Sequence, residues 1–153
     1  MNEQTLHRLE YMQVVEQVTG YANTYVGKTL ARSLRPVTEA SAARSLLEET
    51  AEAAALLRHG ASVPLPSLEG METVFQLVGT GYVFTEADFG AILTFLTGCG
   101  QLRRYMEGKR EQAPRVTSYA HSLYDLADVR REIDRCIRYG RVDDAASGEL
   151  AKV

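Results

Sequence analysis

The sequence contains few of the residues from which disulfide frameworks and metal sites are built. Its two cysteines, Cys99 and Cys136, lie far apart without a CxxC spacing, and the three histidines, His7, His59 and His121, occur singly. Zinc sites need clustered cysteine and histidine ligands, and a disulfide framework needs more cysteines than these. We therefore expect no metal, no cofactor and reduced thiols.

A long apolar run and a basic leader are also missing. No stretch approaches the roughly 18 uninterrupted apolar residues that mark a membrane-spanning helix. The start, Met1-Asn2-Glu3-Gln4, is neither basic nor followed by an apolar signal core. These absences predict a cytoplasmic protein without a membrane partner.

The chain has no excess of positive charge. Its 17 Lys and Arg residues against 20 Asp and Glu residues give a net charge of -3, so the molecule as a whole does not attract a polyanion. Any contact with nucleic acid must therefore come from a local patch. At 153 residues and 45% hydrophobic content the chain can bury a core, and we expect residues 1–153 to form a single domain.

What the sequence does contain is helical periodicity, because apolar residues recur every three or four positions along most of the chain. This predicts an all-α fold, an orthogonal or bundle-like array of about six or seven helices. The helical segments are expected in the first twenty residues and at about 24–36, 38–60, 71–78, 85–106, 116–123 and 126–137.

Capping residues and prolines set several of the predicted boundaries. Thr24 is suited to cap the second helix, and Thr85 with Asp88 has the spacing of a capping box. Pro64 and Pro66 disfavour helix in the residues before them, which predicts an extended segment over 62–67.

The apolar stripes of these helices are expected to face a core. Three glycines inside the 85–106 segment predict either close approach of a neighbouring helix or a local break, since each costs about 1 kcal/mol relative to alanine. The stripes consist of Tyr11, Val14, Val15, Val18 and Ala22; Val26, Leu30 and Leu34; and Leu46, Leu47, Thr50, Ala53, Ala54 and Leu57; the glycines are Gly90, Gly98 and Gly100.

The C-terminal region has strong turn character. Gly140 and the residues that follow it cannot prolong the preceding helix, which allows a short hairpin near the C-terminus. Ser147 is predicted to cap a helix that has barely begun at Val153, so we expect the architecture to continue beyond this segment.

One tripeptide imitates a nucleotide-binding motif. Gly27-Lys28-Thr29 matches the end of a phosphate-binding loop, but the glycine required five residues earlier is Ala22, and the preceding segment is predicted as helix rather than strand. We interpret Gly27 instead as a point where two helix backbones pack closely.

Other candidate catalytic groups are explained more simply by structure. The pairs Glu48 with Glu52 and Asp143 with Asp144 are in solvated surroundings, whereas catalytic carboxylates need perturbed pKa values. The neighbourhood of His121, with Ser118 and Ser122, lacks the Gly-x-Ser-x-Gly motif that presents a nucleophilic serine. Cys136 is interpreted as a small buried hydrophobe. We assign no catalytic residue.

The densest basic region lies near the C-terminus, and Arg131, Arg135 and Arg138 are spaced so that they could meet phosphates from one helix face. Asp128 and Glu132 partly cancel this charge. A helix side covered with salt bridges is the favoured interpretation, and contact with nucleic acid is the alternative.

Three sequence landmarks, in order and spacing, resemble the N-terminal core segment of the bacterial MutS homologues of the second type, the branch associated with suppression of recombination. The landmarks are Met1–Leu6 with Gly27-Lys28 and Leu34-Arg35-Pro36; Leu46–Ala53 with Leu56–Gly60 and Pro64-Leu65; and Ile133–Ile137 with Gly140, Val142, Asp144–Ser147 and Glu149–Ala151. The resemblance covers nearly all of the chain.

The resemblance implies a non-catalytic helical core of a longer DNA-processing ATPase. Members of this family continue with lever and clamp regions, an ATPase and usually an Smr nuclease domain, and they are linked to DNA repair and recombination, branched DNA and stalled ribosomes. The motifs of those domains are absent here, so the resemblance implies that downstream domains are the partners. Two alternatives are a stand-alone helical adaptor that forms homodimers and a weak nucleic-acid-binding domain that uses the arginine face.

Overall fold

A computed structural model describes residues 3–58 and 62–152. The chain divides into two compact units, Met1–Glu48 and Glu49–Val153, and the boundary falls inside helix α4 (Ala40–Arg58). Each unit is described by itself, and the single domain expected from the sequence stays a prediction. Within the described residues no helix is long and apolar enough to cross a membrane.

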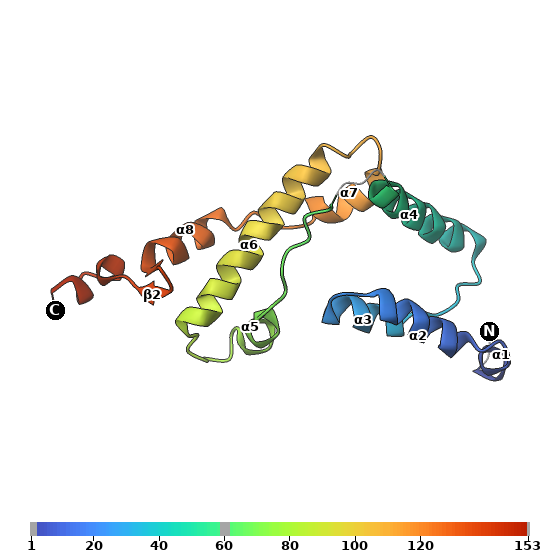
Figure 1. The fold of residues 1–153 in the computed structure, drawn as a ribbon, viewed down its shortest axis with the longest axis horizontal. Helices are drawn as coiled ribbons and strands as arrows, with labels where there is room; N and C mark the ends of the chain where they lie inside the picture. The colour runs from blue at the N-terminus through green and yellow to red at the C-terminus, as the bar shows by residue number, and fades with distance from the viewer. Residues whose placement is uncertain (1–2, 59–61, 153) are drawn as a thin grey trace. The chain divides into compact units, whose positions relative to one another are not determined.

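The structure is predominantly helical, which confirms the predicted fold class (Figure 1). The described residues form eight α-helices, two 3₁₀ turns and one small two-stranded sheet. Their bounds are α1 Glu3–Arg8, α2 Tyr11–Tyr21, α3 Tyr25–Arg32, α4 Ala40–Arg58, α5 Met71–Leu77, α6 Glu86–Glu107, α7 Pro114–His121, α8 Ala127–Cys136, β1 Ile137–Arg138, β2 Arg141–Val142, η1 Asp144–Ala146 and η2 Leu150–Lys152.

The first predicted helix is two helices. Helix α1 ends at Arg8, and Glu10 takes a left-handed backbone conformation with φ of 52° before α2 begins at Tyr11. Neither glycine nor proline lies at this break, so the sequence carries no ordinary signal for it.

In the first unit, helices α2 and α3 pack against each other. Val15 and Thr19 are buried, and the Thr19 hydroxyl donates to the Val15 carbonyl oxygen at 2.8 Å. The predicted cap is confirmed, because the Thr24 hydroxyl accepts the Gly27 amide at 3.0 Å. An exposed ion pair, with 3.8 Å between Arg32 Nε and a Glu16 carboxylate oxygen, joins the two helices.

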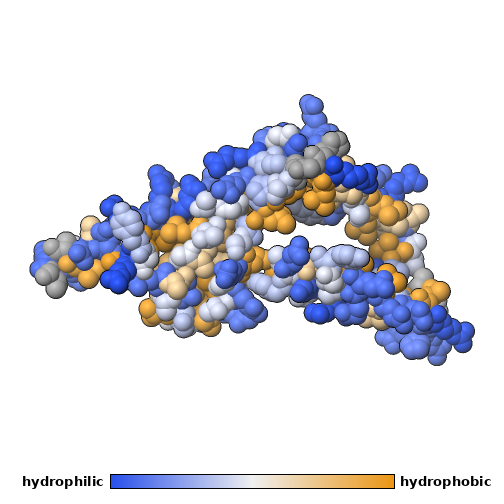
Figure 2. Space-filling model, in the orientation of Figure 1, coloured by the Kyte–Doolittle hydropathy of each residue, from blue (hydrophilic) through white to orange (hydrophobic). Residues whose placement is uncertain are grey.

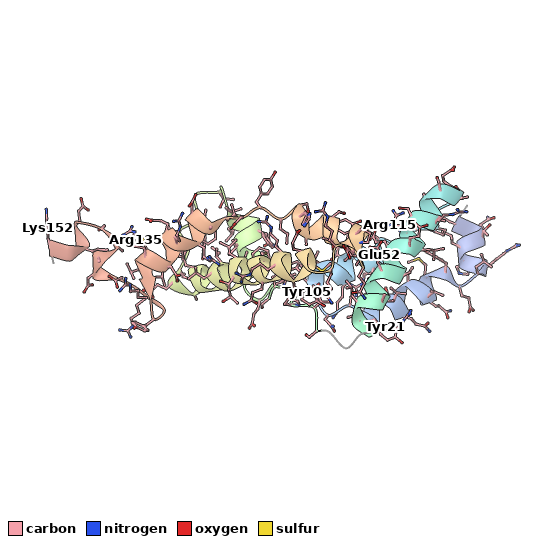
Figure 3. All side chains as sticks on the ribbon, turned by 90° about the horizontal axis from the view of Figure 1, so that it is seen from above. Tyr21, Glu52, Tyr105, Arg115, Arg135 and Lys152 are labelled. Atoms are coloured by element: carbon pink, nitrogen blue, oxygen red, sulfur yellow. The ribbon has the colours of Figure 1, made fainter. Side chains whose placement is uncertain are left out.

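In the second unit, a small core forms where α4, α6 and α7 meet. Its fully buried members are Leu56, Met106, Ala113 and Ala120. The carboxylate of Glu52 accepts the amides of Arg115 and Val116 at 2.8 and 3.1 Å, and Figure 3 shows Glu52 beside Arg115. Because the first amides of a helix have no partner within it, this carboxylate satisfies the start of α7.

Helix α6 is the longest element of the second unit. The sequence predicts a capping box at its start and a close approach or a break at its interior glycines. The capping box is confirmed: the Thr85 hydroxyl accepts the Asp88 amide at 3.3 Å, and Asp88 accepts the Thr85 amide at 2.7 Å. At Gly98 the close neighbour is Pro66 of the predicted extended segment rather than another helix.

The C-terminal hairpin is confirmed. Strands β1 and β2 pair antiparallel, with Ile137 opposite Val142, and the connecting residues Tyr139 and Gly140 have φ values of 53° and 75°. Two successive positive φ values are typical of the tight turns that join antiparallel strands. Ser147 accepts the Leu150 amide at 3.2 Å, but the element that it caps is the short turn η2.

The apolar stripes do not all face a core, which corrects the expectation from periodicity. On α2 only Val15 of the expected stripe is buried, while Val14 and Val18 are exposed. On α4 the buried leucine is Leu56, and the predicted Leu46, Leu47 and Leu57 are exposed. Figure 2 shows such hydrophobic side chains, in orange, at the surface.

Candidate functional site

The sequence that imitates a phosphate-binding loop is the first turn of α3. The Gly27 amide donates to the Thr24 hydroxyl, and the Lys28 amide donates to the Thr24 carbonyl oxygen at 2.9 Å. These amides are therefore engaged in the helix cap and are not free to cradle a phosphate. A Cβ on Gly27 would lie 3.0 Å from the Thr24 hydroxyl oxygen and 3.5 Å from Ala22 Cβ, so the close contact is with side chains, not with a second helix backbone.

The carboxylates and hydroxyls that the sequence offered as catalytic candidates also have structural roles. Glu52 caps α7, and Asp143 accepts the Ala145 amide at 2.8 Å at the start of η1. The Ser118 and Ser122 hydroxyls donate to the backbone carbonyls of Arg115 and Tyr119, at 2.6 and 2.7 Å. The contacts of Asp143, Ser118 and Ser122 are local ones of the kind that commonly begins or ends a helix, whereas Glu52 reaches a different helix.

Of the three predicted nucleic-acid contacts, two lie on α8, where each pairs with a carboxylate one turn earlier. Arg131 pairs with Asp128. Arg135 is bidentate on Glu132, at 2.6 and 3.0 Å. Planar pairs of this type hold both side chains in a defined geometry.

Arg135 also connects α8 to the C-terminal turn (labelled in Figure 3). Its guanidinium donates to the carbonyl oxygens of Ala145 and Ala146, each at 3.2 Å. The hydrogen bond with Glu132 raises the pKa of Arg135 and lowers the pKa of Glu132. Arg135 is therefore committed to contacts inside the unit.

Arg138 does not lie on the helix face predicted from its spacing. Helix α8 ends at Cys136, and Arg138 lies on β1 with its Nε 3.4 Å from an Asp143 carboxylate oxygen. Each of the three predicted arginines thus has an acidic partner in the structure.

A groove between α6, the end of α7 and the start of α8 brings together a second set of arginines. It has a volume of about 650 Å³ and is lined by Arg103, Arg104 and Arg130 together with Tyr124. Among the hydrogen bonds and ion pairs of residues 3–58 and 62–152, none involves the guanidinium groups of these three arginines. Sequence reasoning missed this set because α6 and α8 are distant in sequence and only tertiary packing makes them neighbours.

The rim of this groove contains a histidine–carboxylate pair. His121, the last residue of α7, lies with its Nε2 2.6 Å from a Glu107 carboxylate oxygen at the end of α6. Both side chains are exposed, and Asp125 adds a second carboxylate to the lining. The lining of the groove therefore contains three arginines and two carboxylates, and one of the carboxylates is already hydrogen bonded to the histidine.

The two cysteines are free and do not lie in a metal-binding cluster within the described part of the chain. Cys99 is buried on α6, and this burial raises the pKa of its thiol. A raised thiol pKa leaves less thiolate near neutral pH, which is typical of a cysteine that packs as a small hydrophobe.

Comparison with known proteins gives consistent relatives. The chain is 30% identical to the endonuclease MutS2 of Bacillus velezensis over 154 aligned residues, which cover 98% of this chain and 20% of that protein. It is 29% identical to the endonuclease MutS2 of a Geobacillus species and 28% identical to the putative endonuclease MutS2 of Bacillus subtilis, again over 20% of each. No protein-family model matches the chain.

The chain spans about a fifth of the length of these curated relatives. The aligned part extends over almost the whole of this chain in each comparison, which is consistent with an N-terminal segment of such proteins. Over nearly its full length the chain therefore matches a segment of the MutS2-type proteins, and the resemblance predicted from its sequence is confirmed.

Proposed function

We propose that this chain is a non-catalytic helical packing module of a MutS-type protein, whose partner is the remainder of that protein. The observation that carries the proposal is the apolar face of α3 that the first unit itself leaves uncovered. Helix α3 presents Val26 and Leu30 one turn apart, Leu34 follows two residues after the end of the helix, and all three are exposed. Aligned apolar faces of this kind mark interaction surfaces.

The accessible surface of the chain supports the same conclusion. It is 11554 Å². Two compact bodies with the lengths of the two units would together expose roughly 9,000 Å², whatever their relative placement. The excess means that the two units together bury less of their surface than self-sufficient domains of these lengths do, as expected for a segment whose helices complete their packing against other parts of a protein.

In our proposal those parts correspond to the remaining four fifths of the relatives, and the chemistry that the name endonuclease refers to lies there. In our proposal the module fixes the position of the other domains of a DNA-processing ATPase. That ATPase acts in DNA repair and recombination, or at the ribosome, in the cytoplasm. It acts by packing, and it hydrolyses nothing itself.

The proposal is tested by asking whether the chain binds the rest of such a protein. The Bacillus velezensis MutS2, lacking the segment that this chain matches, is mixed with the purified chain and analysed by size-exclusion chromatography with light scattering. We expect an equimolar complex, and we expect a hydrophobic dye that binds the free chain to be displaced. A chain that stays separate and binds no dye overturns the proposal.

A pair of variants on α3 identifies the surface. Val26→Gln with Leu30→Gln removes the apolar face, and we expect the dissociation constant to rise at least about tenfold, since two partly buried aliphatic contacts are lost. Lys28→Gln, on the same helix, is the matched control and should leave the complex unchanged. Equal effects of the two variants would show that α3 does not contribute its apolar side.

The two alternatives make different predictions in the same measurement. A stand-alone adaptor that dimerises elutes as a species of twice the monomer mass and forms no complex with the truncated relative. The nucleic-acid function expected for Arg131, Arg135 and Arg138 stays a prediction, and each phosphate would have to displace a carboxylate partner already in place.

A further inference from the structure

We propose that the groove between α6 and α8 binds the phosphate groups of a nucleotide unit, either free or within a single strand. The primary ligands are Arg103, Arg104 and Arg130, and Tyr124 provides a surface for the base. Nothing in this inference depends on the packing role of the apolar faces, because the groove lies on other residues.

The first argument is the availability of the guanidinium groups. Arg131, Arg135 and Arg138 are held by carboxylates, whereas the side chains of Arg103, Arg104 and Arg130 make no hydrogen bond or ion pair with the described residues. Arg103 and Arg130 are nonetheless partly buried in the groove walls. A partly desolvated guanidinium without a partner gains more from an oxyanion than one that must first give up a carboxylate.

The second argument is the placement of the three groups in one hollow. Arg103 and Arg104 are adjacent on α6, and Arg130 approaches from α8. Arginine presents its donors in a planar fork that matches the oxygens of a phosphate. A volume of about 650 Å³ falls within the range of roughly 300–1,000 Å³ typical of small-ligand sites.

The third argument distinguishes a nucleotide from a simple anion. Tyr124 lines the same groove and is 85% exposed, so its ring does not pack in the core of the unit. Bases stack on exposed aromatic rings with little regard to sequence. Arg130 also lines a second hollow with Gln101 and Thr97, which gives an extended strand a path beyond the first groove.

The acidic groups nearby limit the site but do not fill it. Glu107, which is hydrogen bonded to His121 at 2.6 Å, and Asp125 line the groove, and Asp134 lines the second hollow. These carboxylates repel a polyanion and so reduce the attraction that the three arginines supply. Affinity is therefore expected to be modest and strongly dependent on salt.

The test measures fluorescence anisotropy of the full chain with three probes at low and physiological salt: labelled oligothymidylate, labelled oligouridylate and a fluorescent ATP analogue. The groove variant is Arg103→Gln, Arg104→Gln and Arg130→Gln together. The control variant, Arg131→Gln, Arg138→Gln and Arg141→Gln, removes the same charge from the adjacent surface. Circular dichroism melting checks that both variants keep the helical fold.

We expect the groove variant to weaken binding at least about tenfold and to flatten the salt dependence by roughly one unit of slope per arginine. The control variant should change binding much less. Tyr124→Leu alone should weaken binding by about fivefold or more through lost stacking. Binding of the oligonucleotides identifies a strand as the source of the phosphate, and binding of the ATP analogue alone identifies a free nucleotide.

Two results overturn the inference. One is the absence of binding by the wild-type chain to all three probes at low salt. The other is equal weakening by the groove and control variants, which would mean that the probes respond to general charge and not to this groove.

Discussion

Several single residues of this chain are explained by one close contact each, and Gly98 is the sharpest case. It lies inside α6, where a glycine ordinarily costs about 1 kcal/mol relative to alanine. A Cβ at this position would lie 2.8 Å from the Cα of Pro66 and 2.9 Å from its Cβ. Because the neighbour is a proline backbone, it cannot move aside as a flexible side chain would.

We therefore expect Gly98→Ala to destabilise the second unit. Overpacking costs about 1–3 kcal/mol, which outweighs the gain of about 1 kcal/mol in helix propensity. Gly90→Ala on the same helix is the matched control, since a Cβ there meets nothing within 4 Å, and it should raise stability by about 1 kcal/mol. Urea unfolding followed by circular dichroism separates the two, and a stabilised Gly98→Ala protein would contradict the Pro66 contact.

At the scale of elements, helix ends are controlled by carboxylates that titrate. Asp88 accepts the Thr85 amide and hydroxyl, both at 2.7 Å, at the start of α6. These hydrogen bonds lower the pKa of Asp88 below its ordinary value. A carboxyl with a lowered pKa in the folded state stabilises the fold fully above its unfolded pKa, and the contribution is lost as pH falls through the folded value.

This gives a pH-dependent prediction for α6. Between neutral pH and about pH 3, wild-type protein should lose more unfolding free energy than Asp88→Asn protein, which has no charge to lose at the cap. The comparison requires urea unfolding at both pH values. Asp125→Asn, at an exposed loop position, is the control and should lose as much as wild type. Identical losses in wild type and Asp88→Asn would show that the capping carboxylate does not contribute.

At the scale of the whole molecule, the two units differ in how much each buries. In the first unit the buried residues among those described are Val15 and Thr19, whereas the second contains the cluster around Met106. Local stability follows buried apolar contacts, and small units with little core open readily.

Hydrogen exchange followed by mass spectrometry should therefore show a large difference between the units. We expect amides in α2 and α3 to exchange faster than those in the second half of α6, by on the order of tenfold or more. Binding of the remainder of a MutS2 relative should slow exchange in α3 specifically. Uniform protection across both units would mean that the first unit is stabilised by something other than its own core.

The arginine pattern shows how the scales combine. A run of basic residues around α8 predicts a charged face, but Arg131, Arg135 and Arg138 each meet a carboxylate three to five positions away. Local spacing of three or four residues favours such pairs, so a charged run on a helix more often neutralises itself than attracts a ligand. The unpaired arginines come from two helices and have no sequence signature.

The sequence by itself determined the local features of this protein: the helical class, the caps at Thr24 and Thr85, the extended prolines and the C-terminal hairpin. These depend on contacts within about four residues, which a sequence displays directly. Tertiary structure alone decided the burial of Leu56 in place of its neighbours and the assembly of the groove. These depend on which helix packs against which, and an apolar stripe does not say whether its partner lies within the chain or outside it.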